Sequence, residues 1–175
     1  MTNILIEKLS EDIVLKEAQI MKCLYIYNES ISESLPNHVF AKRADWEEVI
    51  SESIMNWNSC ELLISKNKEI IGFYLGVGNS LSKMSLLQLF AIDKNYQGNG
   101  YGRVLLEHYL DTVDSLGLTN KVTYAKKEMK DTLKFYQKIW GKIDFNNQLI
   151  DEYGDSIVKI SFNKRPIKVA RFKNN

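Results

Sequence analysis

Residues 86–103, LLQLFAIDKNYQGNGYGR, decide the fold of this 175-residue chain. The segment begins with a run that is apolar apart from Gln88, as expected of a central strand covered on both faces. A loop with three alternate glycines follows, and an amphipathic helix then extends from about residue 100 to residue 116. The stretch therefore predicts a strand, a glycine-rich loop and a helix in succession.

A glycine-rich loop ahead of a helix is suited to binding an anion. The first turn of a helix has unsatisfied backbone N–H groups and carries the positive end of the helix dipole. Gly98, Gly100 and Gly102 lack the Cβ atoms that would keep a phosphate from the backbone, and Arg103 adds a positive charge. The pattern predicts a phosphate or pyrophosphate ligand.

Two common nucleotide-binding motifs fit this loop poorly. A Walker A loop needs GxxxxGK followed by Ser or Thr, which nothing here matches. A Rossmann fingerprint needs G-x-G-x-x-G, and its last position, counted from Gly98, falls on Arg103. A redox or nucleotide-binding protein is therefore the weaker interpretation of the loop.

The remaining apolar patterns predict an α+β fold. Gly117 is expected at the C-cap of the helix that follows the loop, and residues 151–155 are expected to form a hairpin turn. The element order is β-α-α-β-β-β-α-β-α-β-β, which indicates one mixed sheet. The other expected strands are 3–9, 62–64, 70–77, 121–124, 142–150 and 156–162, and the other expected helices are about 10–28, 45–57 and 130–139.

Composition narrows the class of protein. A net charge of +1 argues against a chain built to bind nucleic acid, and no apolar run approaches the ~20 residues of a membrane span. Cys23 and Cys60 form no CxxC and have no His cluster nearby, so we expect reduced thiols and no metal. Without a signal-peptide pattern, a cytoplasmic location is expected. The prediction is one domain, 1–163, followed by a basic tail, 164–175, that is solvated or assists in binding an anionic partner.

Two segments resemble the GNAT superfamily of acetyl-CoA-dependent N-acetyltransferases. Residues 97–102, QGNGYG, satisfy the family signature Gln/Arg-x-x-Gly-x-Gly/Ala. Residues 133–139, LKFYQKI, are similar to the second signature, in which a Phe-Tyr pair precedes a Lys-Leu-Gly-Phe-like end. The resemblance spans about 59–162 and is generic before that. It implies a GNAT-type fold, with a central mixed, twisted sheet of about six or seven strands flanked by about four helices.

The resemblance also implies which residues bind the cofactor. In this family a bulge splays the strand before the loop from its neighbour, so backbone groups of Phe90, Ala91 and Ile92 would pair with the pantetheine arm of coenzyme A. The N–H of Ile92 would polarise the thioester carbonyl. A basic cluster at Lys126, Lys127, Lys130 and Lys134 would either attract the 3′-phosphate or form a solvated face. The implied pyrophosphate-binding loop consists of Gln97, Gly98, Asn99, Gly100, Tyr101, Gly102 and Arg103.

For catalysis, the resemblance implies that Tyr136 donates a proton to the leaving thiolate. A phenol with a pKa of about 10 is protonated at neutral pH. The alternative for Tyr136 is a helix residue whose hydroxyl points at water. The implied reaction is direct attack by a primary amine, of a small molecule or a peptide, on the thioester of acetyl-CoA. A catalytically weak acyl-CoA-binding or sensor protein is the alternative, and a homodimer is compatible with either.

The sequence names no general base. The strand position where many family members carry a glutamate is Gln88, which cannot accept a proton. A second common base position falls on Tyr124, and the asparagine expected seven residues before Tyr136 is Met129. Three residues near the first helices could reach the acceptor pocket or be solvated loop residues: Glu29, Glu33 and His38.

Overall fold

Seven strands form one mixed sheet in a computed structural model that describes residues 4–32, 59–64, 67–139, 141–151 and 154–162. The strands are β1 (Leu5–Lys8), β2 (Ser59–Ile64), β3 (Ile70–Asn79), β4 (Met84–Ile92), β5 (Asn120–Lys126), β6 (Gly141–Ile150) and β7 (Ser156–Phe162). Their spatial order is β1-β2-β3-β4-β5-β7-β6, and only β4 and β5 are paired in parallel. The α+β sheet that the sequence predicts is therefore confirmed.

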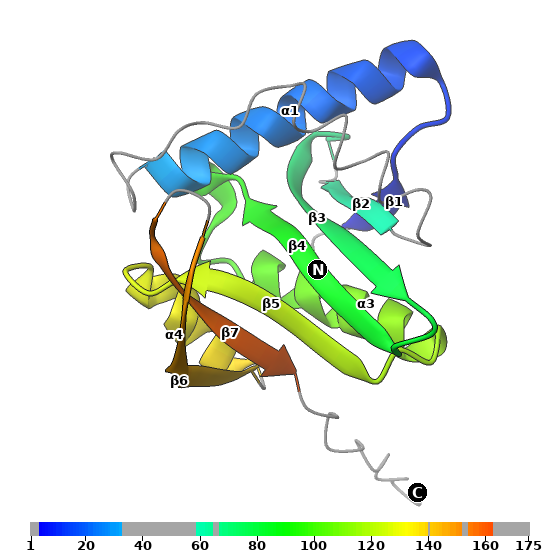
Figure 1. Cartoon of the computed structure of the whole chain (residues 1–175). Helices are drawn as coiled ribbons and strands as arrows, with labels where there is room; N and C mark the ends of the chain where they lie inside the picture. Colours follow the sequence, from blue (N-terminus) through cyan, green and yellow to red (C-terminus); the bar gives the residue numbers. More distant parts are fainter. Residues whose placement is uncertain (1–3, 33–58, 65–66, 140, 152–153, 163–175) are drawn as a thin grey trace, which may run out of the picture.

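Helices cover both faces of this sheet (Figure 1). The described helices are α1 (Ile13–Ser32), the short 3₁₀ helix η1 (Lys94–Tyr96), α3 (Tyr101–Ser115) and α4 (Lys130–Lys138). Helix α1 buries Ile20, Leu24 and Ile26 against one face, in a core shared with Phe73. Helices α3 and α4 bury a larger core against the other face, to which Leu105, Leu106, Tyr109, Leu133 and Tyr136 belong.

Several element boundaries differ from those expected. Helix α1 begins after Asp12, whose carboxylate accepts the amide hydrogen of Leu15 at 2.9 Å, and it continues to Ser32, past the expected end near residue 28. Strand β5 continues two residues beyond the expected 124, because Ala125 and Lys126 pair with β7. The expected helix 45–57 and the tail 164–175 lie outside the described residues.

The end of α3 follows a Schellman pattern. Leu116 is the C-cap, one position before the expected Gly117, which follows it with a φ of 71°. The amide of Leu118 donates to the Val113 carbonyl and that of Gly117 to the Asp114 carbonyl, both at 3.0 Å. No helix in the described part of the chain is long and apolar enough to cross a membrane.

Candidate active site

Strands β4 and β5 separate part-way along their length. They pair from Met84 with Asn120 to Leu87 with Thr123, although β4 continues to Ile92. The last pair is reinforced by the Thr123 hydroxyl, which donates to the Leu87 carbonyl oxygen at 2.7 Å. Among the described residues, no strand pairs beyond this point with the edge of β4 that faces β5, so the two strands form a V with its vertex at Leu87 and Thr123.

A β-bulge lies immediately beyond the vertex. On the side of β3, Leu75 pairs with Leu89 and Gly76 pairs with Leu87, so Gln88 is an additional residue in β4. A bulge of this kind bends and twists its strand. The splay and the bulge that the family resemblance implies are therefore both present.

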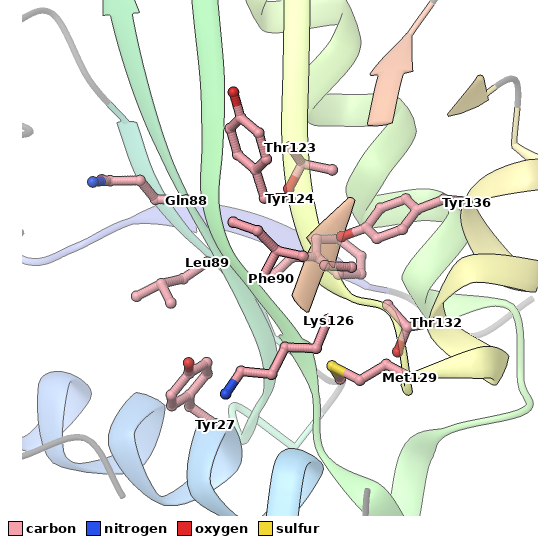
Figure 2. A pocket seen from close by; sticks show the side chains of 12 residues that line it. Tyr27, Gln88, Leu89, Phe90, Thr123, Tyr124, Lys126, Met129, Thr132 and Tyr136 are labelled. Carbon is pink, nitrogen blue, oxygen red and sulfur yellow. The ribbon is translucent and has the colours of Figure 1, made fainter. Parts of the chain in front are cut away.

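A cavity of about 210 Å³ occupies the opening of the V. Tyr27 and Leu89 belong to the core beneath α1, whereas Phe90 and Tyr136 belong to the core beneath α3 and α4. Residues from both faces of the sheet therefore line the cavity, and Figure 2 shows Gln88 and Leu89 on one side of β4 and Tyr136 on the other. Its lining residues are Tyr27, Gln88, Leu89, Phe90, Thr123, Tyr124, Ala125, Lys126, Met129, Thr132, Tyr136 and Ile157.

Tyr136 brings a buried phenol to the vertex. The residue is only 4% exposed and lines the cavity, which argues against a hydroxyl that points at bulk solvent. Burial raises the pKa of Tyr136 well above 10, against a smaller opposing effect of its hydrogen bond with Thr123. The Thr123 hydroxyl, which donates to the Leu87 carbonyl oxygen, is also hydrogen-bonded to the Tyr136 hydroxyl, and both residues line the cavity. The phenol therefore keeps its proton at neutral pH beside the cavity.

The glycine loop leaves the end of β4 in a conformation that requires two of its glycines. Gly98 and Gly100 have φ values of 78° and 83°, in the left-handed region that disfavours other residues. A Cβ atom at either position would have nothing within 4 Å, so the loop backbone is open to a ligand. Asn99 stabilises the turn, since its Nδ2 donates to the carbonyl oxygens of Tyr96 and Gln97.

Backbone amides at the start of α3 are also available to bind an anion. Within the described chain, no backbone acceptor pairs with the N–H groups of residues 98–102. The amide of Arg103, in contrast, donates to the Gly100 carbonyl at 3.1 Å, and its Nε donates to Glu107 at 3.0 Å. Five consecutive amides can therefore bind an anion, and the backbone N–H of Arg103 is already engaged in the helix.

The absence of a side chain at Gly102 has a different structural reason from the one expected. A Cβ atom at Gly102 would lie 3.3 Å from the ring of Phe135 in α4, so the missing side chain lets α3 approach α4. The Phe135 ring in turn stacks on Phe90 at a centroid distance of 5.8 Å. Gly102 therefore serves helix packing behind the cavity, whereas Gly98 and Gly100 open the loop.

The remaining expected cofactor residues, Ala91, Ile92 and Gln97, are either buried in the two cores or hold the loop in place. Ala91 and Ile92 are buried, Ala91 in the core beneath α1 and Ile92 in the opposite core, and neither lines the cavity. The Gln97 side chain donates from Nε2 to the Ile92 carbonyl at 3.0 Å. Asp93 caps η1 through Asn95 and accepts from Lys22 of α1 at 3.1 Å, which ties the first helix to the loop.

The expected basic cluster is partly neutralised. Lys126 pairs with Asp155, and with Asp151 at 3.5 Å, in the turn between β6 and β7. Burial lowers the pKa of Lys126, but the two carboxylates outweigh it and the net pKa is raised. Lys134 pairs with Asp131 at 3.2 Å. Lys126 is therefore part of the cavity wall and is already matched by carboxylates.

The three positions compared with the family's base and asparagine positions all line the cavity. Gln88, Tyr124 and Met129 are among its walls, and no carboxylate is among its described lining residues. Glu29 lies on α1, and Glu33 and His38 fall outside the described residues. No metal-binding group of His, Cys, Asp or Glu is found in the described part. Sequence reasoning missed Tyr27 and Thr123, which have no motif to mark them.

This geometry can be compared with known proteins. Residues 22–141 match the Acetyltransferase (GNAT) family. The chain belongs to the GNAT family. The match favours the acyltransferase interpretation of the glycine loop over the dinucleotide one, and no curated protein gives a significant match.

Solved structures share the GNAT fold at low sequence identity. A GNAT acetyltransferase from Staphylococcus aureus superimposes with a TM-score of 0.73 at 13% identity, over 92% of this chain and 100% of that one. Ard1 from Thermoplasma volcanium gives 0.71 at 14%, over 92% and 99%. The ribosomal-protein-S18-alanine N-acetyltransferase from Escherichia coli gives 0.67 at 15%, over 95% and 99%. At these identities the similarity establishes the fold alone.

Proposed function

We propose that this GNAT protein is an N-acetyltransferase that transfers the acetyl group of acetyl-CoA to a primary amine of a small molecule or peptide. The observation that carries the proposal is the cavity at the vertex of the V, into which the buried hydroxyl of Tyr136 projects. Coenzyme A fits the residues beside it, because the open amides of 98–102 suit a pyrophosphate and the unpaired edge of β4 suits the pantetheine arm.

The chain's own groups have separate tasks in this reaction. Acetyl-CoA supplies an acetyl thioester. The loop amides hold the pyrophosphate, and the edge of β4 aligns the arm so that the thioester lies in the cavity. The Tyr136 hydroxyl turns from Thr123 to the departing sulfur and protonates it, and its raised pKa keeps the proton on the phenol until the thiolate forms.

The test combines binding with transfer. Acetyl-CoA should raise the melting temperature, whereas NAD and ATP should not, because the loop lacks their motifs. Transfer is measured as release of free thiol from acetyl-CoA with polyamines, amino acids, aminoglycosides and peptides with free N-termini. A shift with NAD and none with acetyl-CoA would overturn the proposal.

One observation supports an alternative function for this protein. No carboxylate is among the described residues of the cavity wall, and Gln88 stands where a base is common in the family. A GNAT fold that binds acyl-CoA as a sensor, with weak catalysis, needs no base. Tight binding of acetyl-CoA without thiol release for any amine would favour this sensor function. The cytoplasmic location expected from the sequence stays a prediction under both functions.

A further inference from the structure

Gln88 carries a buried polar atom that the protein itself leaves unpaired. Its Oε1 is buried and has no hydrogen-bond partner within the described chain. Leaving such an acceptor unpaired is unfavourable, and buried polar groups in folded proteins are nearly always paired. Because Gln88 also lines the cavity, the oxygen is suited to a donor that arrives with a ligand.

The bulge decides on which side of the sheet this donor would arrive. Gln88 is the additional residue of the bulge, and its side chain lies on the same side of β4 as that of Leu89, whose core includes α1 (Figure 2). Tyr136 reaches the cavity from the opposite side. A thioester held in the opening would therefore have a proton donor on one side and an amide oxygen on the other.

Resting on the proposed function, we propose that Gln88 binds the attacking nitrogen of the acceptor amine through its Oε1, and that the enzyme uses the amine in its neutral form. A side-chain amide oxygen accepts an N–H hydrogen bond but takes up no proton near neutral pH. It can orient the nitrogen lone pair toward the thioester, but it cannot convert an ammonium ion into an amine.

The proton balance of the step follows from this. A C–N bond forms as the C–S bond breaks, the nitrogen releases one proton to water, and the thiolate receives one from Tyr136, which is reprotonated by water. The products are an N-acetyl amide and a thiol. No oxidant, reductant or metal enters the balance.

Within the described part of the chain, the titratable groups that line the cavity with Gln88 do not replace a carboxylate base. They are Tyr27 from α1, Tyr124 and Lys126 from β5, and Tyr136 from α4. These are phenols and an ammonium group, whose ordinary pKa values are about 10. Lys126 is in addition matched by Asp151 and Asp155. The pH dependence should therefore follow the pKa of the acceptor itself.

The first measurement is the pH profile of kcat/KM for two matched acceptors, ethylamine and 2,2,2-trifluoroethylamine. Ethylamine is an ammonium ion at neutral pH, whereas the fluorinated amine is neutral there. Between pH 6 and 9 the value for ethylamine should rise about tenfold per pH unit, since that is how the neutral fraction of an amine grows below its pKa. The value for trifluoroethylamine should stay nearly flat. Parallel profiles would overturn the proposal, because they would reveal a base on the enzyme.

The second measurement uses substitutions at Gln88. Gln88→Leu removes one hydrogen bond to the acceptor and should lower kcat/KM about tenfold for both amines, with acetyl-CoA affinity unchanged. Because it also removes the unpaired oxygen, it should raise the midpoint of urea unfolding. Gln88→Glu supplies a base and should raise kcat/KM for ethylamine at pH 7 by about tenfold or more.

A matched glutamine serves as the control. The Gln19 Oε1 accepts the amide hydrogen of Ser10 at 2.8 Å, so Gln19→Leu should lower stability and leave transfer unchanged. Transfer unaffected by Gln88→Leu would overturn this inference alone. No transfer by the wild type to any amine would overturn the proposed function and this inference with it. If the wild type acetylates only another amine of the panel, that amine replaces ethylamine and the Gln88→Leu comparison decides.

Discussion

The two halves of β4 present opposite environments within a single strand. From Met84 to Leu87 the strand pairs with β3 on one side and β5 on the other. From Gln88 onward, β3 is the one strand in the described part of the chain that still pairs with β4, and the cavity lies where β5 would continue. The paired half has a strand on both of its backbone edges, whereas the splayed half presents one backbone edge to the cavity.

Two buried tyrosines show what this difference means. In the paired half, the Tyr109 hydroxyl bonds with the Ser85 hydroxyl at 2.6 Å, and Tyr109 does not line the cavity. At the vertex, Tyr136 bonds with Thr123 and does line it. Burial is the largest cause that raises the pKa of each phenol. A buried tyrosine is therefore a candidate catalytic group only where the strands part.

The largest effect is expected at the loop, from Gly100→Glu. A carboxylate against a pyrophosphate costs between about 1 and 4 kcal/mol per charge pair, so acetyl-CoA affinity should fall roughly 100-fold or more. The control is Gly117→Glu at the other end of α3. Both glycines have positive φ and open space around the Cβ position, so both variants carry similar backbone strain. Calorimetric titration that finds equal losses for the two would refute the assignment of the loop.

A smaller effect, on kcat, is expected to distinguish the two buried tyrosines when the hydroxyl of each is removed. Tyr136→Phe should lower kcat about tenfold or more, with little change in acetyl-CoA affinity, because only the departing thiolate loses its donor. Tyr109→Phe should leave kcat within about twofold and lower stability, because Ser85 loses its partner. Steady-state kinetics with both variants give the comparison. Unchanged kcat in Tyr136→Phe would remove that residue from its role.

The smallest effect concerns the partners of the two phenols. Ser85→Ala leaves the Tyr109 hydroxyl unpaired in a fully buried place and should cost about 1–3 kcal/mol of unfolding free energy. Thr123→Val should cost less, about 1 kcal/mol, because water in the cavity can pair with the Tyr136 hydroxyl. Urea unfolding of both variants measures the difference. A larger loss in Thr123→Val would mean that the vertex is as dry as the core.

Sequence reasoning worked best where a local pattern reports backbone conformation. The glycine loop, the apolar β4 and the turn at residues 151–155 were all predicted, because positive φ angles and apolar runs restrict the chain locally. The ends of α1 and β5 were less accurate. Strand β5 is longer than its apolar run, since β7 pairs with two further residues whose partners are remote in sequence.

The site depended on contacts between distant segments. The sequence marked Lys126 as one of a basic cluster, and the fold placed it between two aspartates of the β6–β7 turn. It marked Gly102 as an opening for phosphate, and the fold placed Phe135 against it. The charge and size of a residue can be read from the sequence. Which group that residue contacts is determined by the packing of segments that are distant in sequence.

By itself, the sequence determined the family and the conformation of the loop, because glycines at two positive-φ positions ahead of an amphipathic helix leave few alternatives. Only the tertiary structure decided where β4 leaves β5, that Gln88 lies in a bulge at that point, and that Tyr136 reaches the same opening. The physical reason is that a cavity belongs to no single segment. It exists only where two strands that could have continued pairing are held apart.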